Sequence, residues 1–191
     1  MSARAFLRAS LAGLTLMCVA LLAVHGTGED GLRVVVRASA RTSVVLFAAV
    51  FAASGLRRLW RAPLSAWLVR CRRQVGLAFA WSHALHLAAI LGLVFSVPSF
   101  APTVSPITIL GGGSGYVLIA GMAATSTDAA VKRLGQRRWR ALHLTGLWVV
   151  FGIFAQSYVP RALANPNYIA PAALLVAALV VRLLPTRARV S

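Results

Sequence analysis

Three histidines in this chain lie in or beside apolar stretches long enough to cross a membrane. His83 and His86 lie within the run Val75–Val97, and His143 lies near the start of the run Ala141–Val159. An ionisable side chain at membrane depth is costly, and it tends to face the bundle interior or a functional site. Imidazole is also a common axial ligand of haem iron. These residue types therefore indicate a candidate electron carrier that binds haem, and the alternative is that the histidines only form hydrogen bonds to neighbouring helices.

The spacing of the histidines limits how they could share one haem. His83 and His86 are three residues apart and lie on one helix face, whereas two axial ligands approach the ring from opposite sides. A partner must come from another helix, and His143 is the candidate. With a rise of about 1.5 Å per residue, His86 lies about 20 Å along its helix from Arg73, and His143 lies about 5 Å from Arg140. The spacing leaves open whether His86 and His143 reach one level, and His83 is the substitute ligand, about 4.5 Å nearer.

Six segments approach the roughly 20 mostly apolar residues that a transmembrane helix requires. They are Phe6–His25, Thr42–Leu56, Val75–Val97, Ile107–Thr125, Ala141–Val159 and Tyr168–Leu184. The second is short unless its helix includes residues before Thr42. The glycine cluster at 111–115 in the fourth predicts close packing against neighbouring helices. The first has the basic start of a signal peptide, but its long apolar run favours a retained helix. We expect an all-α membrane protein, a six-transmembrane-helix bundle that forms a single integral membrane domain over residues 1–191.

The basic residues are distributed unevenly between the two sides of this bundle. Sixteen of the 20 Lys and Arg residues fall on the side that carries both termini, Arg187 and Arg189 among them. The other four are Arg33, Arg37, Arg41 and Arg161. The side richer in Lys and Arg is normally cytoplasmic. The sequence therefore predicts that both termini are cytoplasmic.

The composition excludes several other classes of protein. A net charge of +17 would suit nucleic-acid binding, but the arginines gather at the ends of apolar runs, where they set topology. The three acidic residues are too few for paired-carboxylate or Ser-His-Asp chemistry. Cys18 and Cys71 form neither a disulfide framework nor a zinc pattern. The loops are short and the glycine cluster lacks the P-loop lysine, so a flavin or nicotinamide domain would belong to another chain.

Two arginine clusters, at residues 70–73 and 137–140, flank the histidine-bearing spans. Their ordinary role is topology and contact with lipid headgroups. A guanidinium also pairs well with carboxylates and phosphates, so haem propionates or the phosphates of a partner are the alternative contacts. Between the fourth and fifth spans, the polar run 125–128 predicts the cap of a short helix that ends at Leu134.

Two stretches of the chain resemble the ferric-reductase-like transmembrane domain family. The third helix of that family is similar to Arg70–Leu87, RCRRQVGLAFAWSHALHL, and its turn into the fifth helix is similar to Thr125–Leu144, TSTDAAVKRLGQRRWRALHL. The resemblance covers most of residues 40–185 and extends to the haem-bearing membrane subunits of bacterial methionine sulfoxide reductase systems. It implies a multi-pass protein of the bacterial inner membrane that binds haem b, one or two per chain. The implied partners are the lipid bilayer, a periplasmic reductase and a cytoplasmic flavin reductase, with flavin or quinone as the electron source and no nucleic acid.

The same resemblance identifies the candidate ligands. In the family, two haems stack between two helices, each with two histidines thirteen or fourteen residues apart. His86 matches the outer position of the first helix, and Arg72 stands fourteen residues before it. His143 matches the inner position of the second helix, and Gln156, a poor haem ligand, stands thirteen residues after it. The resemblance thus implies His86 and His143 as metal ligands, with His83 as their substitute and Arg72 also in contact with the cofactor.

Two functions follow from this sequence. The first is a membrane haem b protein that transfers electrons from a cytoplasmic or quinone donor across the membrane, as the electron-transfer subunit of an oxidoreductase. The second is a six-helix scaffold or permeation protein that kept the fold and lost haem, which Gln156 favours.

Overall fold

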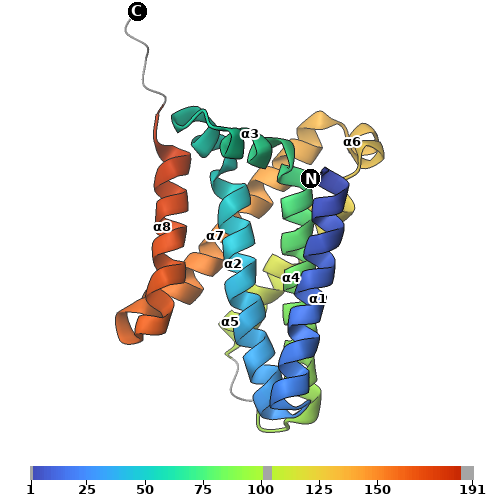
Figure 1. The fold of residues 1–191 in the computed structure, drawn as a ribbon, viewed down its shortest axis with the longest axis vertical. Coiled ribbons are helices and arrows are strands. Elements are labelled where there is room, and N and C mark those ends of the chain that lie inside the picture. The colour runs from blue at the N-terminus through green and yellow to red at the C-terminus, as the bar shows by residue number, and fades with distance from the viewer. Residues whose placement is uncertain (1, 101–104, 186–191) are drawn as a thin grey trace, which may run out of the picture.

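The computed structural model describes residues 2–100 and 105–185 (Figure 1). Within those ranges the chain is helical and contains no strand, and six of its helices are long and apolar enough to cross a membrane. The helices are α1 (Ala3–His25), α2 (Glu29–Leu59), α3 (Pro63–Arg70), α4 (Arg72–Ser96), α5 (Pro106–Ala124), α6 (Asp128–Leu134), α7 (Gln136–Ala164), the 3-10 turn η2 (Pro166–Tyr168) and α8 (Ile169–Leu183). The predicted all-α bundle with six membrane-spanning helices is confirmed.

Helix α2 lies at the centre of the bundle and packs most extensively against α4 and α8. Its Phe47 and Phe51 are fully buried. At Gly55 the backbones of α2 and α8 approach so closely that a Cβ atom would lie 2.2 Å from the carbonyl oxygen of Val181. Small residues permit such close helix pairs in membranes. α2 therefore fixes the positions of the helices on both sides of it.

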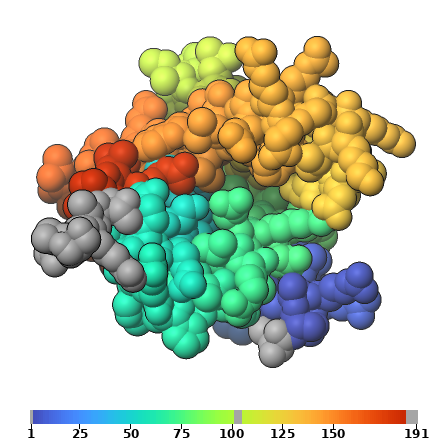
Figure 2. All heavy atoms as spheres, turned by 90° about the horizontal axis from the view of Figure 1, so that it is seen from above, coloured from blue at the N-terminus to red at the C-terminus, as the bar shows by residue number. Residues whose placement is uncertain are grey.

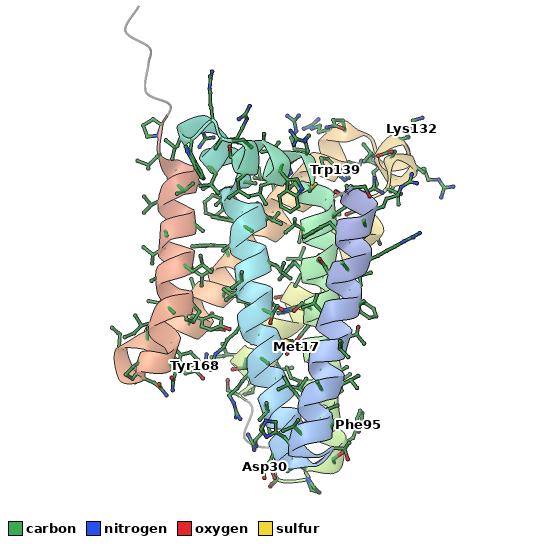
Figure 3. The ribbon with its side chains drawn as sticks, viewed as in Figure 1. Met17, Asp30, Phe95, Lys132, Trp139 and Tyr168 are labelled. Atoms are coloured by element: carbon green, nitrogen blue, oxygen red, sulfur yellow. The ribbon has the colours of Figure 1, made fainter. Side chains whose placement is uncertain are left out.

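The short helices α3 and α6 lie at the same end of the bundle as the start of α1 and the end of α8 (Figure 1). We call this the basic end, because the starts of α4 and α7 and their arginines also lie there. Figure 3 places Lys132 and Trp139 at this end, and Asp30 and Phe95 at the opposite end. The start of α1 and the end of α8 lie at the same end, which agrees with an even number of membrane crossings. Arg187 and Arg189 lie outside the described residues, and the cytoplasmic location of the basic end stays a prediction.

Five of the six predicted spans match a helix to within five residues at each end, but the second does not. Helix α2 begins at Glu29 rather than at Thr42, so three arginines expected in a loop lie on its first turns: Arg33, Arg37 and Arg41. Their spacing of four places them on one helix face. Arg33 also forms an ion pair with Glu29, one turn earlier, at 2.7 Å. A long arginine side chain can reach the membrane surface from a position within a helix, so arginines near the end of a span do not mark the end of the helix.

The prediction that the glycine cluster packs against neighbouring helices is wrong for most of its members. Only Gly115 is buried, and a Cβ atom there would lie 2.9 Å from Ile153 Cδ1 of α7. The first three glycines, 111–113, would meet nothing within 4 Å. Small residues allow close packing of helices but do not enforce it.

Two short helices connect the spans at the basic end. Helix α6 runs from Asp128 to Leu134 as predicted, and its cap is Thr127, whose hydroxyl accepts the N–H of Ala130 at 3.1 Å. Helix α3 was not predicted. It begins with Pro63, a favourable first residue for a helix, and it buries Leu68 beneath its exposed arginine end.

Candidate functional site

A cavity of about 680 Å³ opens at the basic end, between the first turns of α4 and those of α7. Figure 2 looks onto this end and shows α4 in green and α7 in orange on its two sides. The end of α5, residues of α2, α3 and α6, and Arg182 of α8 complete the walls. The volume lies within the roughly 300–1,000 Å³ typical of cofactor and ligand sites.

His143 lines this cavity and is held by the end of α5. Its Nε2 lies 3.2 Å from Thr125 Oγ1, and the Thr125 hydroxyl donates to the carbonyl of Gly121 at 2.7 Å. The threonine oxygen is therefore the acceptor for a ring N–H of His143. The ring of Trp139 lies beside that of His143, tilted by 32° with 4.4 Å between the ring centroids, and its indole N–H donates to the carbonyl of Thr125. Among the described residues the second ring nitrogen has no hydrogen-bond partner, so it is free to bind a ligand.

Arginines surround the mouth of the cavity. The five that line it are Arg70, Arg72, Arg73, Arg140 and Arg182. Asp128 is the one acidic residue among the described lining residues, and it pairs with Arg73 at 3.5 Å in an exposed position. The cavity therefore favours a ligand with negatively charged groups at its outer edge.

Two of these arginines have side chains fixed by the bundle. Arg72 donates weakly to the Ser54 hydroxyl of α2, at 3.4 Å. Arg182 donates to the carbonyl of Phe51 at 2.8 Å, and its guanidinium lies over the rings of Phe51 and Trp148 at 4.5 and 5.3 Å. Both are held by α2, so their charges stay beside the cavity.

His86 lies in the contact between α4 and α2. Its Nδ1 lies 3.1 Å from the carbonyl oxygen of Val36 and 3.0 Å from Ser39 Oγ. Because a carbonyl can only accept, Nδ1 carries the proton and Nε2 keeps its lone pair. Beside it, Ser43 donates to Ser82 at 2.9 Å across the same contact. These buried polar groups tie α4 to α2.

His83 stacks on His86 at 5.4 Å, and its Nδ1 is buried without a hydrogen-bond partner among the described residues. Tyr116 of α5 covers the ring of His83 at 4.8 Å. Phe79, one turn earlier on α4, contacts His83 at 5.5 Å and also lines the cavity. Phe79 therefore lies between the cavity and the two histidines of α4.

The structure thus divides the predicted site residues into two groups. It brings His143 and Arg72 to one cavity and stacks His83 on His86, but it does not bring His143 to His86. At about 1.5 Å per residue, His86 lies about 21 Å along α4 from Arg72. Gln156, which stands on α7 where the resemblance would place the outer histidine, is exposed.

Sequence reasoning missed two residues of the cavity. Thr125 was considered only as part of a helix cap, although its hydroxyl holds His143. Arg182 was counted only among the basic residues of the side that carries both termini, although it lies inside α8 and lines the cavity. An arginine within an apolar run was the available signal, because such a residue seldom faces lipid.

Comparison with known proteins matches residues 39–154 to the family described as ferric reductase like transmembrane component. The protein-methionine-sulfoxide reductase heme-binding subunit MsrQ of Ralstonia nicotianae is 37% identical over 132 residues, which are 67% of this chain and 59% of that protein. Proteins of the same name from Polaromonas naphthalenivorans and Herminiimonas arsenicoxydans are 34% and 35% identical, each over 61% of this chain and 53% of their own length. The chain therefore spans a little over half the length of these curated relatives. No solved structure matches it significantly.

Proposed function

The chain belongs to the family of ferric reductase like transmembrane components, and on this premise we propose that it is a haem-binding membrane subunit that transfers electrons. The names of its relatives, heme-binding subunits of a methionine sulfoxide reductase, support this proposal. The observation that carries it is the cavity at the basic end, with His143 in its wall and arginines around its mouth.

The residues around this cavity fit haem b. Phe47, Phe79 and Ile119 give apolar walls for a porphyrin, and the arginines at the mouth can pair with its propionates. The free ring nitrogen of His143 would be the iron ligand, and Thr125 would hold the ring in position. Bound haem supplies one-electron chemistry, at a potential set by its ligand and its surroundings. The chain itself orients the imidazole and shields the porphyrin from lipid.

We place the basic end in the cytoplasm, in a multi-pass protein of the bacterial inner membrane, because most of the Lys and Arg residues lie there. The electron donor would then be a cytoplasmic flavin reductase or a membrane quinone. The acceptor would then lie on the periplasmic side, and the relatives, named heme-binding subunits of a protein-methionine-sulfoxide reductase, favour a reductase in that role.

A reduced-minus-oxidised absorption spectrum of the detergent-purified protein tests this proposal. The wild type should show b-type haem bands, and His143→Ala should lose them. His25→Ala is the matched control, because His25 is an exposed residue at the end of α1, and this variant should keep the bands. A properly inserted wild type that takes up no haem would instead support the scaffold or permeation protein.

A further inference from the structure

The α4 wall of the cavity holds no group that could bind iron. Its lining residues are Arg72, Arg73, Gly76, Phe79 and Ala80. A guanidinium stays protonated in proteins and is never an acceptor, and the other side chains have no donor atom. α4 therefore supplies no partner for His143 on the other side of a bound haem.

The remaining walls supply no opposing ligand either. Protein ligands of haem iron are His, Cys, Met and Tyr. Of these types, only His143 and Met122 line the cavity among the described residues. Met122 packs on α7, where a Cβ atom on Gly146 would lie 2.7 Å from its sulfur. Gly146 is three residues after His143, so the thioether lies on the same wall as the imidazole and cannot reach the opposite side.

The outer level of the bundle lacks a ligand pair of its own. His83 and His86 share one face of α4, so they cannot bind one iron from opposite sides of a haem. The rings of Tyr116 and Phe154 pack against His83 at 4.8 and 5.7 Å. Gln156, at the corresponding place on α7, is exposed. Among the described residues, a second haem held between two imidazoles therefore has no site there.

We propose that this chain binds one haem, in the cavity at the basic end, with His143 as its sole protein ligand. The coordination position facing α4 is then open to a small exogenous ligand such as carbon monoxide. This inference rests on the proposed function, and it adds a ligand-binding site that a haem held by two histidines would not have.

The experiment uses the full chain, purified with haem, and measures the haem-to-protein ratio and the spectrum of the reduced protein with and without carbon monoxide. We expect one haem per chain and a carbon monoxide-dependent shift of the main absorption band. Arg72→His places an imidazole on the α4 wall, so this variant should become six-coordinate and lose the shift. His86→Ala, which removes an outer histidine, should keep both the haem and the shift.

Electron paramagnetic resonance of the oxidised wild type gives a second readout that needs no variant, and we expect a high-spin signal. Two haems per chain, or a low-spin wild type without the shift, would each overturn this inference and leave the proposed function standing. A wild type that binds no haem would overturn both.

Discussion

Replacing Thr125 with valine removes the hydroxyl that contacts His143 and keeps the volume of the side chain. The lost contact is the one between Thr125 Oγ1 and His143 Nε2, at 3.2 Å. The valine leaves the second ring nitrogen in place, so the iron ligand is still present but less well oriented. A change in haem binding would therefore report on positioning by Thr125 and not on loss of the ligand.

The size of the effect follows from the role of such partners in metal sites. Loss of the hydrogen bond to a metal-ligating histidine typically costs 10–100-fold in metal affinity. That range corresponds to about 1.4–2.7 kcal/mol. The assay is titration of the haem-free protein in detergent with haem, followed by the rise of the main absorption band. Thr125→Ser keeps the hydroxyl and should restore most of the affinity.

Ser126→Ala is the matched control. Ser126 also lines the cavity, but its hydroxyl donates to the carbonyl of Met122 and does not contact His143. This variant should bind haem like the wild type. If Thr125→Val binds haem as tightly as the wild type, or if Ser126→Ala weakens binding equally, then the proposed positioning of His143 by Thr125 is wrong.

Two further predictions concern the fold and its orientation. Gly55→Ala forces a Cβ atom against the Val181 carbonyl and should cost about 1–3 kcal/mol of stability in thermal unfolding, because overpacking displaces α8. Gly13→Ala, with open space around it, should be neutral or stabilising by up to about 1 kcal/mol, and equal effects at the two sites would contradict this packing. Cysteines introduced at the exposed Lys132 and Asp30 should react with an impermeant maleimide from opposite sides of the membrane, Asp30→Cys from the periplasm. Both native cysteines are buried and should give little background labelling. The reverse labelling pattern would show that the orientation in the membrane is opposite to the one proposed.

Most of the fold could be predicted because length and apolar composition suffice to identify a transmembrane helix. The start of α2 could not be found in this way, since hydropathy treats Arg33, Arg37 and Arg41 as polar whether or not they lie in a helix. Their four-residue spacing was the better guide, because it indicates one helix face. Helix α3 was also missed. It is stabilised by burial of Leu68 against the bundle, a tertiary contact that no local pattern reveals.

The candidate site was predicted in part. Arg72 and His143 were both identified, but only as departures from a family pattern, and the sequence did not show that they line the same cavity. That depends on helix tilt and on the start of α7 at Gln136, five residues before the apolar run begins. An arginine inside the apolar run of α8 indicated that Arg182 does not face lipid, but its place beside this cavity requires the close approach of α2 and α8 at Gly55.

The three histidines, which look alike in the sequence, have different surroundings in the bundle. A hydrogen bond between membrane helices contributes about 0.6 kcal/mol on average and about 1.7 kcal/mol at most. The contact of His86 with Val36 and Ser39 therefore gives this residue a structural reason to be there without any metal. His143 has one nitrogen held by Thr125, the other free, and a hollow bordered by arginines beside it. An imidazole at membrane depth is thus weak evidence for a ligand by itself, and the adjacent cavity is what distinguishes His143 from the other two.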